Sequence, residues 1–157
     1  MKVISDMKIM DFESSSIPRH NLLGGILSIS LNSDSHKSYT LEQWERRVVP
    51  ALMLGQFSYY LSDEGLPLAF CNWAFVSTAV RSALLTGGRD IVPSDWQSGD
   101  SPFIVELIAP FGHEQQVVAD VAERVFKISR GDKICVQRGL RHTGIGYVTK
   151  SVEWIGI

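Results

Sequence analysis

The sequence predicts a mixed α/β fold, in which a central mixed or antiparallel sheet is flanked by helices. Apolar residues recur at helical spacing in several segments that follow capping or turn-forming residues. Short runs rich in aromatic and apolar residues, bounded by Gly, Pro and Asp, are typical of strands. Helices come first along the chain, and several strands follow with two further helices between them. This order favours one sheet covered by helices.

The composition is that of an ordinary globular protein. The chain has 157 residues, of which 45% are hydrophobic and 20% are charged, enough for one domain with its own core. A formal net charge of -2 argues against general affinity for nucleic acid. No run reaches the ~18 apolar residues of a membrane span, and acidic residues interrupt residues 1–20, where a signal peptide needs an apolar core. We therefore expect a cytoplasmic protein without a stable membrane span.

Residues 1–20 are expected to form a loose N-terminal arm, and residues 21–157 a single domain. The arm is polar around residues 14–16 and contains Pro18. The domain begins with a helix over residues 21–31, where leucines and isoleucines form an approximate helical stripe.

The remaining elements follow in order. A capping box at residues 40–43 starts a helix that reaches residue 52 and is kinked or divided at Pro50. Strands over residues 57–61 and 68–76 flank a turn with Asp, Gly and Pro. Further along, the pattern predicts helices over residues 77–85 and 117–126, and strands over residues 103–108, 134–137 and 147–157.

Glu106 is the only charged residue in the apolar run 103–108. Period-two alternation predicts that Ile104, Glu106 and Ile108 share one face of a strand. Burial of an ionised carboxylate is costly unless a cation or hydrogen-bond donors accompany it. The pattern leaves two interpretations open: a functional or paired Glu106, or an edge strand on which Glu106 is solvated.

His36 is the histidine placed best for catalysis, because it lies between a turn cluster and the start of a helix. No metal site is predicted, since Cys71 and Cys135 lie far apart without other ligands at metal spacing. Residues 141–146 spell R-x-x-G-x-G, a pattern used for coenzyme A, but strand-like residues follow instead of the helix that this loop needs. We therefore expect no bound cofactor.

Several blocks occur in one order over residues 22–150. They read LG at 23–24, H at 36, P at 50, PLAFCNWA at 67–74, DWQSGD at 95–100 and IAPFG at 108–112. In this combination the chain resembles the RTX-toxin-activating lysine acyltransferases, which transfer fatty acyl chains from acyl-carrier protein to internal lysines of pore-forming protoxins. The resemblance implies a fold like that of the N-acetyltransferases, with the carrier-bound phosphopantetheine thioester as co-substrate.

The resemblance also implies catalytic roles for two residues. The family's catalytic histidine falls on His36, and its catalytic aspartate falls on Glu106, so the carboxylate is retained but displaced by one methylene, on the order of 1.5 Å. Because a free lysine has a pKa near ~10.4, the reaction needs a base. We expect His36 to remove the amine proton, while Glu106 fixes the imidazole tautomer and favours its charged form. A covalent acyl-histidine is an alternative.

Further site residues are expected from the same resemblance. Arg138 and Ser33 would bind the oxyanion or the acyl donor. Phe70, Trp73 and Ile108 would line an acyl groove, with core packing as the alternative. The expected partners are acyl-carrier protein and an acceptor protein or peptide with the target lysine, and a homodimer is left open. The alternative functions are an acyltransferase that lipidates another peptide or protein, and an inactive module that binds the carrier or acceptor.

Overall fold

The computed structural model describes residues 3–4, 7–10, 18–86, 89–128, 133–143 and 146–156. In these residues it contains one seven-stranded sheet, in the order β1-β2-β3-β4-β5-β6-β7. The strands are β1 (Val3–Ile4), β2 (Met7–Met10), β3 (Phe57–Leu61), β4 (Pro67–Val76), β5 (Ser101–Ile108), β6 (Lys133–Thr143) and β7 (Gly146–Gly156). All neighbouring strands are antiparallel except β5 and β6, which are parallel. The predicted mixed sheet is confirmed.

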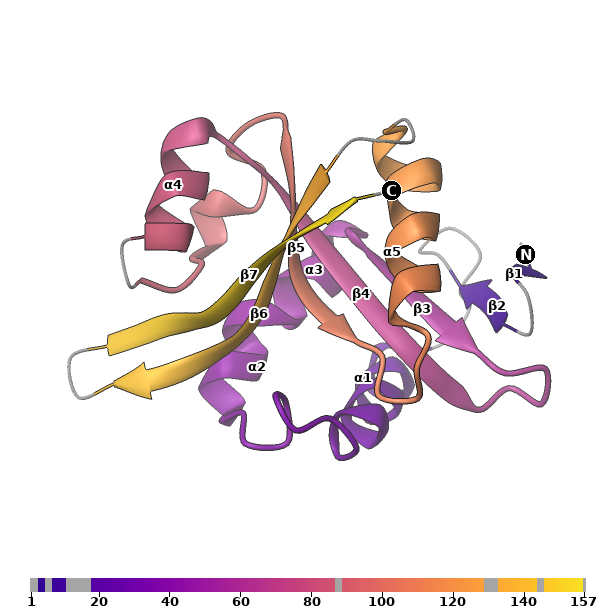
Figure 1. Ribbon diagram of the computed structural model, residues 1–157. Coiled ribbons are helices and arrows are strands. Elements are labelled where there is room, and N and C mark those ends of the chain that lie inside the picture. The colour runs from indigo at the N-terminus through magenta and orange to yellow at the C-terminus, as the bar shows by residue number, and fades with distance from the viewer. Residues whose placement is uncertain are drawn as a thin grey trace.

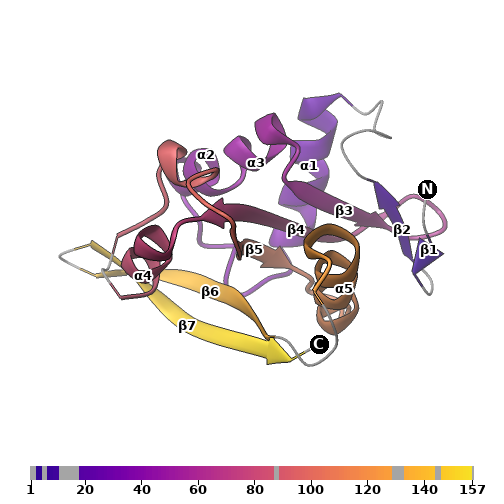
Figure 2. The same ribbon diagram turned by 90° about the horizontal axis from the view of Figure 1, so that it is seen from above.

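Helices cover both faces of this sheet, as Figures 1 and 2 show. The helices are α1 (Arg19–Ser30), α2 (Leu41–Arg47), α3 (Val49–Leu54), α4 (Thr78–Thr86) and α5 (Glu114–Val121), with a 3-10 turn at Pro93–Asp95 and a π turn at Ala122–Phe126. Residues of α1, α3 and α4 share one hydrophobic cluster with the sheet, and α5 shares the other. We call these two sides the α1–α4 face and the α5 face. The arrangement is compatible with the expected N-acetyltransferase-like fold, which stays a prediction.

Pro50 divides the long helix that the sequence predicts. The capping box is present, since Thr40 Oγ1 accepts from the Gln43 N–H and Gln43 Oε1 accepts from the Thr40 N–H. Helix α2 then ends at Arg47, and Pro50 lies in the first turn of α3, where its missing N–H costs no intrahelical bond. The division places Arg47 at the buried end of α2.

The N-terminal segment differs from the expected loose arm. Residues 7–10 form β2, and Ile9 of β2 pairs with Tyr60 of β3. Met7 and Ile9 are buried in the cluster of the α5 face. The sequence analysis missed this strand because the segment is short and its pairing partner lies far along the chain.

A β-bulge interrupts the pairing of β4 with β5. Asn72 pairs with Glu106 and Trp73 pairs with Ile104, so Val105 is an extra residue on β5. The β5 residues that pack on the α1–α4 face are Phe103, Val105 and Ile108. Ile104 packs on the α5 face instead, whereas Glu106 points to the α1–α4 face, toward the loop before α2. The prediction that Ile104 and Glu106 share a face is therefore wrong, because the bulge shifts the alternation by one residue.

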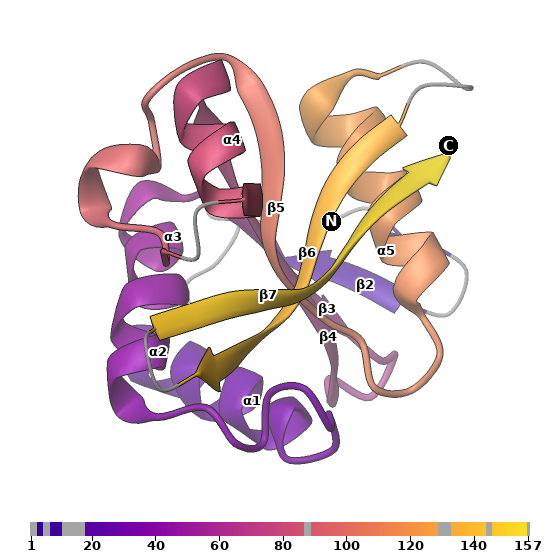
Figure 3. The same cartoon turned by 60° about the vertical axis from the view of Figure 1, so that its left-hand side comes forward.

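The parallel strands β5 and β6 separate toward their C-terminal ends. Their last pair joins Ile104 to Val136, and no later pair joins them within the described parts of the two strands. The ends of the two strands point to different sides of the molecule in Figure 1, and Figure 3 shows β6 and β7 in front of β3 and β4. Glu106 and Arg138 therefore lie on strand segments that are not paired with each other.

Candidate active site

The structure brings the two predicted catalytic residues into direct contact. His36 Nε2 lies 2.6 Å from Glu106 Oε2, and the two side chains are 6% and 1% exposed. His36 belongs to the turn after α1, where its N–H donates to the Ser33 carbonyl. Glu106 is directed toward it by the bulge in β5. A loop and a strand far apart in the sequence thus form one buried pair.

Ser33 extends this pair on the other side of the imidazole. Its Oγ lies 2.6 Å from His36 Nδ1. An ionised carboxylate only accepts hydrogen bonds, so the network assigns the proton of the neutral ring to Nε2, and Nδ1 accepts from the Ser33 hydroxyl. The hydrogen-bonded series Ser33–His36–Glu106 has the same order of roles as the triads that activate a hydroxyl or an amine.

A buried arginine holds Glu106 from the opposite side. Glu106 Oε1 accepts from Arg47 Nε and from the Tyr39 hydroxyl, the latter at 2.8 Å. The guanidinium of Arg47 also donates to Asp90 Oδ1 at 2.6 Å and to the Val105 carbonyl at 2.8 Å. Arg47 thus bridges two carboxylates and the carbonyl of the bulge residue.

These contacts determine the ionisation of the site. Burial raises the pKa of Glu106, but the positive charge of Arg47, followed by His36, outweighs burial and holds the pKa at about 2. Burial and the charge of Glu106 raise the pKa of Tyr39, so its hydroxyl keeps the proton that it donates. Burial lowers the pKa of Arg47, but Glu106, Tyr39 and Asp90 together outweigh this effect, and the net shift is upward. At neutral pH the site therefore contains an ionised Glu106 beside a charged Arg47.

Asn72 joins the bulge to the end of α2. Its side-chain Oδ1 accepts from the Glu106 N–H at 2.8 Å, and its Nδ2 donates to the Arg47 carbonyl at 2.8 Å. Asn72 is fully buried. One amide therefore satisfies two backbone groups, one at a bulge and one at a helix end, that would otherwise lack buried partners.

The sequence analysis did not identify Arg47, Tyr39, Asn72 or Asp90 as site residues. Arg47 carried a signal, because it lies three residues after Trp44 in the helical stripe and a cation on a buried stripe needs a carboxylate. Asn72 stands out in a similar way, as an amide within the apolar run of β4. Tyr39 and Asp90 lie in loops, where no periodicity indicates burial.

The other predicted site residues lie elsewhere. Phe70 and Ile108 are in the core of the α1–α4 face, and Trp73 is in the core of the α5 face. Their burial on opposite faces of the sheet agrees with core packing, the alternative to an acyl groove. Arg138 lies in β6, paired with Ser151. Its side chain is outside the described part of the structure, so its role stays a prediction.

Other kinds of site find no support in the described residues. No group of three or more His, Cys, Asp or Glu side chains in the described part of the chain could hold a metal ion. Burial raises the pKa of the Cys71 thiol, which keeps it protonated. No helix among the described residues is both long and apolar enough to cross a bilayer.

Comparison with known proteins places this site in a family. Residues 16–153 match the family model described as the RTX toxin acyltransferase family. The chain is 44% identical to a lysine-acyltransferase of Vibrio cholerae over 136 residues, which cover 87% of this chain and 89% of that protein. It is 35% identical to a leukotoxin-activating lysine-acyltransferase of Mannheimia haemolytica over 104 residues, 66% of this chain and 62% of that protein. It is 28% identical to a protein-lysine myristoyltransferase of Kingella kingae over 116 residues, 69% of each chain. The predicted resemblance is confirmed: the chain belongs to the RTX toxin acyltransferase family and is an acyltransferase.

Proposed function

We propose that the protein transfers a fatty acyl chain from the phosphopantetheine thioester of acyl-carrier protein to the ε-amine of internal lysines in an RTX-type protoxin. The observation that carries this proposal is the Ser33–His36–Glu106 chain, with Glu106 held ionised by Arg47. The names of the relatives support lysine as the acceptor, and one relative named as leukotoxin-activating supports a toxin acceptor. The carrier-protein donor rests on the family resemblance.

His36 Nδ1 is the nitrogen that can serve as the base. Nε2 donates to Glu106, whereas Nδ1 faces the half-buried Ser33 hydroxyl. The lysine ammonium loses a proton to Nδ1, either after the amine displaces Ser33 or through Ser33 Oγ. Glu106 compensates the positive charge that His36 gains, and its carboxylate stays at the same distance from the imidazole ring.

The neutral amine nitrogen then attacks the thioester carbonyl carbon. A C–N bond forms, the tetrahedral oxyanion collapses and the C–S bond breaks. The proton that His36 took from the ammonium passes to the leaving thiolate. The neutral ring then takes the second proton from the new amide nitrogen and releases it to solvent, so that His36 returns to its neutral form. Arg138 stays the proposed cation for the oxyanion or the donor, a role that rests on the family resemblance.

The reaction is tested by intact mass. The protein is incubated with tetradecanoyl-acyl-carrier protein and a protoxin fragment, and the acceptor should gain the mass of one tetradecanoyl group per modified lysine. His36→Ala should abolish this gain. The control is His20→Ala, because His20 is exposed on α1. No gain with the wild type, or an undiminished gain with His36→Ala, would sink the proposal.

Direct transfer is favoured over an acyl-histidine, because both ring nitrogens of His36 are hydrogen-bonded. The covalent form that the contacts allow is an acyl group on Ser33 Oγ. If Ser33 only relays the proton, Ser33→Ala should lower kcat by roughly 10-fold while transfer continues. If Ser33 is the nucleophile, the variant should be inactive, and digestion of acid-quenched wild-type enzyme should give an acylated peptide that contains Ser33.

Two further expectations stay proposals. The proposed location is the cytoplasm, where the protein would meet its carrier-protein donor. A homodimer is tested by sedimentation of the purified protein at several concentrations.

A further inference from the structure

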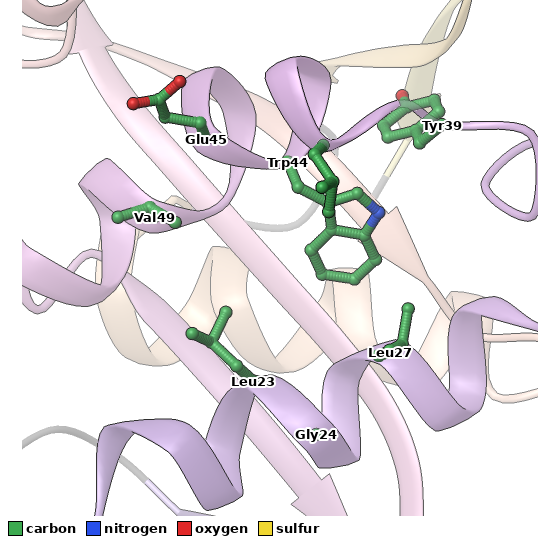
Figure 4. A pocket seen from close by; sticks show the side chains of 8 residues that line it. Leu23, Gly24, Leu27, Tyr39, Trp44, Glu45 and Val49 are labelled. Atoms are coloured by element: carbon green, nitrogen blue, oxygen red, sulfur yellow. The ribbon is translucent and has the colours of Figure 1, made fainter.

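An apolar pocket of about 430 Å³ lies between α1 and the helices α2 and α3 (Figure 4). Leu23 and Leu27 point from α1 toward Trp44, whose indole projects into the gap between the helices, while the Glu45 carboxylate points away. Val49 adds a further apolar wall. The volume falls within the roughly 300–1,000 Å³ of small-molecule sites.

Tyr39 connects this pocket to the candidate active site. It lines the pocket, and its hydroxyl donates to Glu106 at 2.8 Å. Its ring centroid lies 5.1 Å from that of His36. One end of a ligand in the pocket would therefore be separated from the His36–Glu106 pair by the ring of Tyr39.

The mouth of the pocket exposes apolar surface that an occupant would cover. Leu27 is 50% exposed and Leu41 is 87% exposed. Both residues line the pocket. A contiguous exposed apolar patch usually marks a binding surface, and an apolar lining with little polar chemistry fits a hydrocarbon chain.

Gly24 keeps the α1 side of the pocket open. A Cβ built at Gly24 would meet no atom within 4 Å, so the space beside it is empty. Its neighbour Gly25 has a different reason to be glycine, because a Cβ there would clash with the Tyr59 hydroxyl where α1 packs on β3. Gly24 is therefore not required by packing, and the space that it leaves belongs to the pocket.

We propose that this pocket holds the hydrocarbon tail of the fatty acyl donor, and that Gly24 sets the longest chain that fits. The proposal rests on the proposed acyl transfer, and it assigns the tail to the gap between α1 and α2 with the thioester carbonyl at His36. It replaces the expected groove of core residues in the sheet with a pocket beside the reactive pair.

The test is a chain-length series with Gly24→Leu. The new side chain should be tolerated, because leucine favours a helix more than glycine does and the position is open. With octanoyl to hexadecanoyl carrier-protein donors, the rise in KM of the variant relative to the wild type should be smallest for the shortest chain and should grow with chain length. Each methylene that the pocket can no longer hold weakens binding by about fourfold. If the variant excludes about three methylenes of the tetradecanoyl chain, its KM for this donor should rise roughly 50-fold. The control is Ser82→Leu, which adds a leucine at an exposed position of α4, a helix that does not line the pocket.

Binding of a dansyl-labelled fatty acid to each folded variant gives a second readout that needs no turnover. The wild type and Ser82→Leu should bind the probe, and tetradecanoic acid should displace it from both. Gly24→Leu should bind the probe at least about tenfold more weakly. An unchanged chain-length preference in folded Gly24→Leu overturns the proposal. The proposal is also overturned if Gly24→Leu lowers transfer equally for every chain length and leaves probe binding unchanged. The pocket would then contact the acceptor or the carrier. If the wild type transfers no acyl chain at all, the proposed function is wrong. Probe binding alone then tests whether the pocket holds a hydrocarbon chain.

Discussion

Arg47 is the residue on which the charge balance of the site depends. Its side chain is fully buried, and it contacts Glu106, Asp90 and the Val105 carbonyl. Removal of one member of a buried ionic group leaves the others without compensation. Arg47 is therefore a positioning residue, which acts on the reaction through Glu106.

Arg47→Met should destabilise the protein and change its pH dependence. We expect the free energy of unfolding to fall by about 3–5 kcal/mol, because the buried Glu106 loses its cation and the buried Asp90 is left with Arg46 at 3.6 Å. The pKa of Glu106 should rise, since Arg47 is the largest cause of its lowering. As the pH is lowered, the variant should therefore lose activity at a higher pH than the wild type does. Urea unfolding and a pH–rate profile measure the two effects.

The matched control is Lys37→Met, because Lys37 is an exposed cation that pairs with the exposed Asp34. Its effect on stability should stay below about 1 kcal/mol. Equal effects of the two substitutions would contradict a special role of the buried arginine.

Glu106 can be tested separately for its charge and for its reach. Glu106→Gln keeps the size of the side chain and removes the charge, and kcat should fall by roughly 10²–10⁴-fold. Glu106→Asp keeps the charge but withdraws it from the 2.6 Å contact with His36, so its kcat should lie between those of the wild type and Glu106→Gln. Single-turnover rates measure this order. Near-normal turnover of Glu106→Gln would show that Glu106 is only structural.

The bulge in β5 is the element that turns a core strand into part of the site. Without the extra residue Val105, strict alternation would direct Glu106 to the α5 face, where Ile104 packs. The bulge also leaves the Val105 carbonyl free to accept from Arg47. Asn72 replaces the lost strand pairing by accepting from the Glu106 N–H.

Asn72→Ala should weaken this element. The Glu106 N–H and the Arg47 carbonyl would lose their partner, at roughly 1–3 kcal/mol for each buried group. Activity should fall with stability, because the bulge holds Glu106 against His36. Urea unfolding and hydrogen exchange of the Glu106 amide test this expectation. Asn32→Ala is the control, since Asn32 is exposed and donates to one carbonyl within a turn. A control effect as large as that of Asn72→Ala would count against the bulge.

Local periodicity predicted the elements whose pattern lies within one segment. The division at Pro50 and the hairpin of β3 and β4 are of this kind. The bulge and strand β2 were missed because both depend on a partner strand distant in the sequence. In the site, the resemblance indicated His36 and Glu106, whose contact the structure shows. Arg47 was missed because the helical stripe had been counted from apolar residues alone.

The candidate active site and a second polar cluster lie on opposite faces of the sheet. His36, Glu106 and the pocket lie on the α1–α4 face. The α5 face has its own polar cluster, in which Tyr60 and Arg124 donate to Asp120. This cluster joins α5 and the turn after it to β3, on the opposite side of the sheet from the site. Changes at the site should therefore leave the packing of α5 intact.

Acid stability gives a test on the whole protein. The pKa of Glu106 is about 2 in the folded protein, against an ordinary value of 4.5 for a glutamate side chain. A depressed folded pKa stabilises the protein above the unfolded value, so this contribution is complete above pH 4.5 and is lost as the pH falls toward 2. The shift corresponds to a contribution on the order of 3 kcal/mol. The stability difference between the wild type and Glu106→Gln should shrink over this pH window, as measured by urea unfolding at steps of pH. Glu42→Gln, which removes an exposed carboxylate on α2, should follow the wild-type curve. A constant difference between the wild type and Glu106→Gln down to pH 2 would show that the buried arginine does not hold Glu106 ionised.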